Sequence, residues 1–275
     1  MIKRIEITSS KVKKEVKFLL ISDIHKNKYI KKDNLSKLKK DLKDFKSIDY
    51  ILIPGDVIDT PKHLVKESFI EELKKSLKEF IEDKPTYIVL GNHDIVGEKP
   101  EDEYLYSILN SINNIKCLTN EEVINIDDIS IKGFSPNLDY YKRLHSNKNE
   151  FLRQFKEVKA SKLSKNKFNI LLTHNPNSII KISTENNECI DNNIDLVISG
   201  HMHNGLVPRK LQNIMNHRGI VGPYYTLLPS YAHGTIKIKN TNYIILGAVN
   251  PIIKAPLYNK IYGYDAIILT IKKDK

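Results

Sequence analysis

Five short apolar runs recur along the sequence, and each is followed within two or three residues by Asp, His or Asn. The runs cover residues 17–22, 50–54, 87–90, 169–173 and 196–199. Runs of this length, rich in Ile, Leu and Val, are typical of strands buried on both faces. Functional groups gather at the carboxyl ends of strands in open α/β sheets, so we expect five distant segments to converge on one site.

Two amphipathic helices are predicted between the first three strands. Apolar residues recur at helical spacing over residues 31–46 and again over residues 65–81. Strands that alternate with helices indicate βαβ units with parallel strands. The apolar positions are Leu35, Leu38, Leu42 and Phe45 in the first helix, and Val65, Phe69, Leu73, Leu77 and Phe80 in the second.

Two hairpins are also predicted, so antiparallel pairs should accompany the parallel strands. Residues 122–134 read as a hairpin that turns at Asp127 and Asp128. Residues 235–249 read as a second hairpin that turns near residues 240–242.

The length and composition favour one domain that spans residues 1–275. The sequence has no internal repeat, no low-complexity tract and no Pro/Gly linker. Its first twenty residues do not resemble a secretion signal, and no apolar run approaches the roughly 20 residues of a membrane-spanning helix. The expectation is a cytoplasmic protein, with peripheral membrane association left open. Cys117 and Cys189 lie far apart and predict reduced thiols.

The net charge of +11 is concentrated near the N-terminus. Residues 1–46 hold fifteen Lys/Arg and six Asp/Glu, whereas the remaining 229 residues hold 29 and 27. We interpret the lysines of residues 31–46 as the solvated face of the first helix. Attraction to anionic lipid headgroups or to nucleic acid is the alternative.

The residues that close the runs are the types that bind divalent metals. Two ions held a few ångströms apart need a bridging carboxylate and several nitrogen or oxygen donors. Asp23 and His25 are spaced two apart, which places both side chains on one side of an extended strand end. His201 and His203 repeat this spacing, and Asp56 is the candidate bridge. The sequence therefore predicts a site for two divalent metal ions.

In their order along the chain, these residues resemble the signature of the calcineurin-like metallophosphoesterases, in particular the small bacterial type. The family pattern is DxH, GDxxD, GNHD, a lone His and GHxH, which stands here as residues 23–25, 55–59, 91–94, His174 and residues 200–203. The resemblance spans roughly residues 17 to 205, plus a C-terminal hairpin. It implies an α/β (α+β) fold, in which a two-sheet β-sandwich of mixed parallel and antiparallel strands is flanked by helices.

The resemblance also implies a role for each motif residue. It places His93 beside the scissile phosphate rather than on a metal, and it makes Asp59 the residue that orients His93. Asp94 is left outside the ligand set as a helix cap or loop brace. The implied ligands are Asp23, His25 and His203 for one ion, Asn92, His174 and His201 for the other, and Asp56 for both.

The implied reaction is hydrolysis of a phosphodiester or phosphomonoester on a small or lipid-linked substrate. A water shared by the two ions loses its proton near neutral pH and attacks phosphorus, while His93, kept protonated by the Asp59 carboxylate, protonates the leaving oxygen. Mn²⁺ is the first choice of metal, and Fe, Zn, Co or Ni are alternatives. A nuclease is the alternative function. A non-catalytic scaffold is disfavoured because every motif residue is present, and no protein partner is expected.

Several polar residues outside the motifs have open interpretations. His63 reads as a surface residue, with contact to the substrate as the alternative, and His145 reads as exposed. His217 and His233 read as structural or surface groups. Tyr140, Tyr141 and Arg143 form a polar aromatic cluster that lines a pocket or packs a loop.

Overall fold

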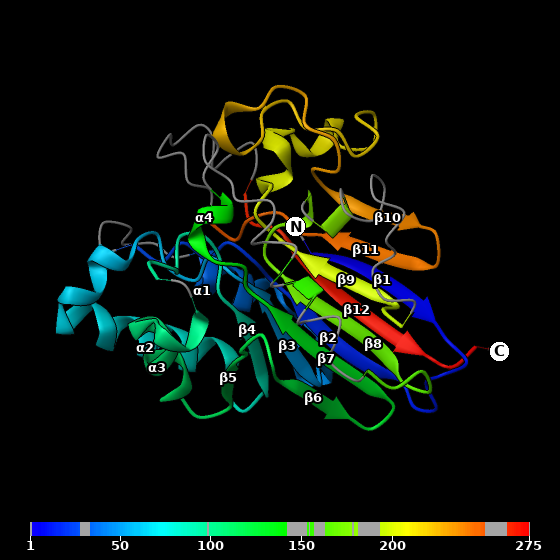
Figure 1. Cartoon of the computed structure of the whole chain (residues 1–275), viewed down its shortest axis with the longest axis horizontal. Coiled ribbons are helices and arrows are strands. Elements are labelled where there is room, and N and C mark those ends of the chain that lie inside the picture. The colour runs from blue at the N-terminus through cyan, green and yellow to red at the C-terminus, as the bar shows by residue number, and fades with distance from the viewer. Residues whose placement is uncertain are drawn as a thin grey trace.

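Two six-stranded sheets pack face to face in the computed structural model (Figure 1). The structure describes residues 2–27, 34–97, 99–141, 153, 155–156, 163–177, 179–180, 193–250 and 263–274. Both sheets mix parallel and antiparallel strands. The predicted fold class is therefore confirmed.

The first sheet has the strand order β1-β12-β2-β3-β4-β5. Strands β2 to β5 run parallel, as the alternation of strands and helices predicts. The last strand, β12, enters between β1 and β2, parallel to the former and antiparallel to the latter. The bounds are β1 (Ile2–Thr8), β2 (Val16–Leu20), β3 (Tyr50–Pro54), β4 (Thr86–Val89), β5 (Ile115–Cys117) and β12 (Ala266–Lys272).

The second sheet has the order β10-β11-β9-β8-β7-β6. Its two edges are the antiparallel pairs β6–β7 and β10–β11, so both predicted hairpins are confirmed. The inner strands β7, β8, β9 and β11 run parallel to one another. The bounds are β6 (Val123–Ile126), β7 (Ile129–Phe134), β8 (Phe168–Thr173), β9 (Leu196–Ser199), β10 (Gly234–Ile238) and β11 (Thr241–Ile245).

Helices α1, α2 and α3 cover the outer face of the first sheet, on the left in Figure 1. The α-helices whose full bounds lie within the described residues are α1 (Asn34–Asp41), α2 (Glu67–Ile81), α3 (Tyr104–Asn110) and α4 (Leu138–Tyr141). Short 3-10 turns cover Phe45–Ser47, Pro61–Val65, Pro100–Asp102, His203–Leu206, Arg209–Leu211 and Pro223–Tyr225. Among the described residues, no helix combines the length and apolar character needed to cross a membrane.

Two details of the predicted helices are wrong. The second helix begins at Glu67, and Val65 is 83% exposed at the end of a 3-10 turn instead of facing the core. The first helix ends at Asp41. Leu42 and Phe45 are still buried, but they belong to the segment that follows the helix. Residues 31–33 of the predicted helix lie outside the described residues.

Part of the N-terminal positive charge is neutralised by acidic groups elsewhere in the fold. Lys11 Nζ lies 2.7 Å from Asp195 Oδ1, and Lys39 Nζ lies 2.8 Å from Glu82 Oε1. Lys39 also lies over the ring of Phe45 at 3.5 Å from its centroid. These ion pairs favour a structural role for Lys11 and Lys39 over a role in binding nucleic acid.

One buried core lies between the two sheets. Phe18, Leu20 and Leu52 of the first sheet form one buried cluster with Ile170 and Leu172 of the second. The five predicted strands therefore bury both faces, one against the other sheet and one against the helices or loops outside.

Leu172→Ala should destabilise the protein by about 2 to 5 kcal/mol, because it removes a fully buried side chain from the core between the sheets and leaves a cavity. Urea unfolding measures the change in the free energy of unfolding. Val65→Ala is the control, since its side chain is 83% exposed, and it should have little effect. Equal, small effects of both variants would contradict a core shared by the two sheets.

Candidate metal centre

The motif residues meet at the carboxyl ends of five strands from both sheets. Asp23 and His25 follow β2, Asp56 follows β3, and Asn92 and His93 follow β4. The second sheet supplies His174 after β8, and His201 and His203 after β9. Parallel strands whose ends share one edge bring these distant segments together, as predicted.

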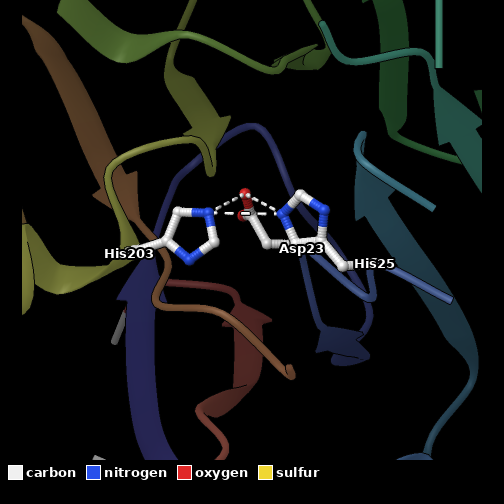
Figure 2. A group of neighbouring side chains, drawn as sticks. All are labelled: Asp23, His25 and His203. Carbon is white, nitrogen blue, oxygen red and sulfur yellow. Dashed lines mark hydrogen bonds and ion pairs between the residues drawn. The ribbon is translucent and has the colours of Figure 1, made fainter. Parts of the chain in front are cut away.

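Asp23, His25 and His203 form the first group of candidate ligands. His203 Nε2 lies 3.2 Å from Asp23 Oδ1, and His25 Nε2 lies 3.7 Å from the same oxygen. The two Nε2 atoms are 3.3 Å apart. Figure 2 shows the two imidazoles on either side of the Asp23 carboxylate. Three donor atoms therefore face a common point, as ligands of one ion do.

Asp56, His174 and His201 form the second group. His174 Nε2 lies 3.1 Å from Asp56 Oδ2 and 3.2 Å from His201 Nδ1. His174 Nδ1 donates a hydrogen bond to the Pro54 carbonyl at 2.7 Å. This bond fixes the tautomer and leaves the lone pair of Nε2 for a cation.

Asp56 connects the two groups. Its Oδ2, 3.1 Å from His174 Nε2, is also 3.6 Å from His25 Nε2. Its Oδ1 accepts a hydrogen bond from the main-chain N–H of His93 at 2.8 Å, which holds the carboxylate in place. One carboxylate oxygen thus lies between a histidine of each group, where a bridging ligand belongs.

The backbone is strained at most of these positions. A positive φ is uncommon for residues other than glycine, and it costs about 1–3 kcal/mol where the surrounding structure enforces it. The turns that follow the strands aim the side chains into the site through this conformation. The candidate ligands with positive φ are Asp23 (54°), His25 (44°), Asp56 (55°), His201 (67°) and His203 (47°).

Two glycines permit the close approach of these turns. A Cβ at Gly91 would overlap the carboxylate of Asp56, and a Cβ at Gly200 would overlap Ser22 Oγ and Asp23 Oδ2. Asp23 Oδ2 also accepts the main-chain N–H of His201 at 3.1 Å. These contacts give a packing reason for the glycines of the GNHD and GHxH motifs, which residue spacing alone does not supply.

The buried charges of the site favour cations. Asp23 and Asp56 are fully buried. Burial opposes the charge on His174, but the Asp56 carboxylate outweighs it and raises the pKa of His174 to about 9. Burial, together with the nearby His174, lowers the pKa of His201 to about 3. A proton on His174 thus partly neutralises the buried carboxylates, and a divalent ion would neutralise them more fully.

Asn92 offers a further ligand atom. Its Oδ1 is buried and has no hydrogen-bond partner among the described residues. A buried oxygen without a partner is costly in a native protein unless an ion or water satisfies it. This orphaned oxygen and the mixed Asp/His donor set fit divalent metal ions. The assignment of each residue to a particular ion stays a prediction.

The support of His93 differs from the expected one. His93 Nδ1 donates to the main-chain carbonyl of Asp59 at 2.7 Å, whereas the Asp59 carboxylate accepts a hydrogen bond from Asn27. Asp59 thus contacts His93 through its backbone, and the expected carboxylate contact is not formed. Burial lowers the pKa of His93, but the charge of Asp56 and the Asp59 carbonyl outweigh it, so the pKa is raised.

Asp94 acts as a loop brace, one of the two interpretations that the sequence leaves open. Its carboxylate accepts main-chain N–H groups of Val57, Ile58 and Gly91 at 2.9 to 3.2 Å. These bonds tie the GDxxD and GNHD loops together. Burial and the neighbouring Asp56 raise the pKa of Asp94 to about 7, despite these three donors.

Of the polar residues outside the motifs, one lies beside the candidate ligands and the others have structural contacts or are not described. His63 is buried against the ring of Phe69, so its interpretation as a surface residue is wrong. The ring centroid of Tyr141 lies 5.7 Å from that of His201, which places Tyr141 beside the candidate ligands. His217 Nδ1 donates to the carbonyl of His233, a structural contact. Three positions fall outside what the structure describes: Arg143, His145 and the side chain of Tyr140.

Comparison with known proteins identifies the same motif region. A family model described as calcineurin-like phosphoesterase matches residues 16–205. An uncharacterized metallophosphoesterase of Campylobacter jejuni is 27% identical over 228 residues, which cover 82% of this chain and 54% of that protein. One from Helicobacter pylori is 30% identical over 207 residues, covering 75% and 49%. The chain therefore spans about half the length of these curated relatives.

A solved structure shares the fold. Phosphopantetheinyl hydrolase from Mycobacterium tuberculosis superposes with a TM-score of 0.50 at 12% sequence identity. The match covers 94% of this chain and 97% of that one. At this identity the likeness concerns the fold alone.

Gly200→Ala should weaken Mn²⁺ binding about 10- to 100-fold, because the new Cβ displaces the Asp23 carboxylate that faces the two histidines. Titration calorimetry of the chelator-treated protein measures the affinity. The matched control is Gly97→Ala, whose Cβ meets only Glu103 Oε1, at 3.3 Å, and whose affinity should be unchanged. Wild-type affinity in Gly200→Ala would contradict the assignment of Asp23 as a ligand.

Proposed function

The chain belongs to the calcineurin-like phosphoesterase family, and from this premise we propose that it is an enzyme that hydrolyses phosphate esters with two divalent metal ions. The observation that carries the proposal is the position of Asp56, whose Oδ2 lies between His174 and His25. Asp56 is therefore positioned to be shared between two neighbouring ions.

Each of the two proposed ions would take ligands from both sheets. When bound, such ions lower the pKa of water and neutralise charge on the phosphate oxygens. The mixed nitrogen and oxygen donors suit Mn²⁺, our first choice, and also Fe, Zn, Co or Ni. The proposed ligands are Asp23, His25 and His203 for one ion, Asn92, His174 and His201 for the other, and Asp56 for both.

His93 is the proposed proton donor to the leaving oxygen. Its Nδ1 is occupied by the Asp59 carbonyl, so Nε2 is the ring nitrogen left to face a substrate. The raised pKa favours the protonated imidazolium that such a donor needs. Since the ring of His93 lies 4.7 Å from that of His25, the proton is held next to the metal ligands.

We further propose that residues 1–275 act as one catalytic domain. The first sheet supplies Asp23, His25 and Asp56, and the second supplies His174 and His201. Both sheets also contribute to the buried core between them. Neither half therefore carries a complete site or a complete core.

Purified protein should hydrolyse bis-p-nitrophenyl phosphate or p-nitrophenyl phosphate when Mn²⁺ is supplied, and a chelator should abolish the reaction. Release of nitrophenolate measures the rate. A second panel of phosphomonoesters, cyclic nucleotides, nucleotide diphosphates, phospholipid headgroups and DNA separates an esterase of small or lipid-linked substrates from a nuclease. No turnover with any of the five metals across pH 5 to 9 would refute the proposal.

His93→Ala should lower kcat at least about 100-fold, because it removes the proton donor and no proposed metal ligand. Metal content by elemental analysis should stay at the wild-type value. Loss of bound metal would instead assign His93 to the ligand set, and unchanged turnover would remove it from the reaction.

Asp59→Asn should lower kcat far less than His93→Ala, because the contact to His93 comes from the main-chain carbonyl, which the substitution retains. The pH profile of kcat distinguishes the two supports. If the carboxylate sets the charge of His93, the Asn variant should shift the limb of the profile that reports the proton donor. An unshifted profile supports the backbone contact.

A further inference from the structure

Residues 219–229 form a tight hairpin beside the metal centre, which we call the apolar hairpin. Gly219 donates to the Pro229 carbonyl at 2.8 Å, and Leu228 donates to the Ile220 carbonyl at 3.0 Å. The chain reverses at the 3-10 turn Pro223–Tyr225. In Figure 1 this orange segment projects at the top, beyond the strands of both sheets.

The side chains of this hairpin expose an unusual amount of apolar surface. Tyr225 is 87% exposed, Leu227 77%, Leu228 57% and Ile220 40%. Among the described residues, six of the nine large exposed hydrophobic side chains lie within residues 211–228. Single exposed apolar residues are ordinary, but a group of them marks a surface that contacts another apolar phase or partner.

The stretch of sequence that contains the apolar hairpin carries only positively charged side chains. Residues 196–264 contain seven Lys/Arg and no Asp or Glu, a bias that the near-balanced total for residues 47–275 conceals. Lys210 and Arg218, which precede the hairpin, are both exposed. Exposed aliphatic and tyrosine side chains together with cations match the interface of an anionic bilayer. A nucleic-acid surface would instead present cations and stacking rings, without exposed leucines.

The hairpin is continuous with the candidate active site. A pocket of about 120 Å³ is lined by Pro223, Thr226 and Pro229 of the hairpin and also by His201 of the metal centre. The hairpin and the metal centre therefore both contribute to the wall of this pocket. Phosphate groups of a lipid layer would come close to the metal centre without leaving that layer.

We propose that the apolar hairpin docks the protein on an anionic phospholipid bilayer, with Leu227 and Leu228 entering the interface and Lys210 and Arg218 contacting the headgroups. This docking directs the pocket at His201 toward the membrane surface. The substrate class that follows is a phosphate ester carried by a membrane lipid, a step that rests on the proposed function.

Sedimentation with vesicles tests the docking without any turnover. The wild-type protein should bind vesicles of phosphatidylcholine mixed with phosphatidylglycerol more tightly than phosphatidylcholine alone. The double variant Leu227→Ser/Leu228→Ser should bind at least about tenfold more weakly, because both side chains lose their apolar contact with the lipid. Lys210→Gln/Arg218→Gln should lose the preference for phosphatidylglycerol.

Val65→Ser is the matched control, since Val65 is 83% exposed and lies outside residues 196–264. It should bind vesicles like the wild type. A thermal midpoint equal to that of the wild type verifies that the hairpin variants are folded.

Three results would overturn the docking. They are absence of wild-type binding to either vesicle, equal binding by the leucine variant, and a concentration-dependent dimer that the leucine variant abolishes, which would show a second copy on this surface. Hydrolysis of bis-p-nitrophenyl phosphate in water tests the proposed function separately, so either proposal can fail alone.

Discussion

Two carboxylates, Asp23 and Asp56, lie fully buried within hydrogen-bonding distance of imidazole nitrogens, and this concentration of charge constrains the rest of the structure. Burial of an ion without compensation costs several kcal/mol. The protein alone meets part of this demand by raising the pKa of His174. Two divalent cations would neutralise the remaining negative charge, and they would also give Asn92 Oδ1 a partner.

The fold serves that cluster by bringing loops from two sheets to one edge. The turns after the strands adopt strained positive φ values at most of the candidate ligands, and glycines at positions 91 and 200 let the loops approach one another. Such strain persists only where the surrounding structure is firmly held. The shared core between the sheets and the three main-chain hydrogen bonds to Asp94 provide that support.

The site divides into three parts with different chemistry. The buried Asp and His groups could hold cations, while His93, the proposed proton donor, is held by the Asp59 carbonyl. The apolar hairpin meets the same pocket from the outside through Pro223, Thr226 and Pro229. The proposed metal binding, proton transfer and approach to a lipid surface therefore involve separate residues, and substitution can test them separately.

The sequence by itself determined the five strands, both hairpins, the family and the set of residues at the site. These features are local, because apolar periodicity defines a strand and the polar residue that closes it lies at the strand's end. Only the tertiary structure placed β12 between β1 and β2, buried His63, exposed Val65, and supported His93 through a carbonyl instead of the Asp59 carboxylate. Only the structure shows that the apolar hairpin is exposed, because in the sequence its leucines cannot be distinguished from core residues. The contacts of a side chain or carbonyl are made with segments far apart in the chain. The spacing of residues within one segment does not predict those contacts.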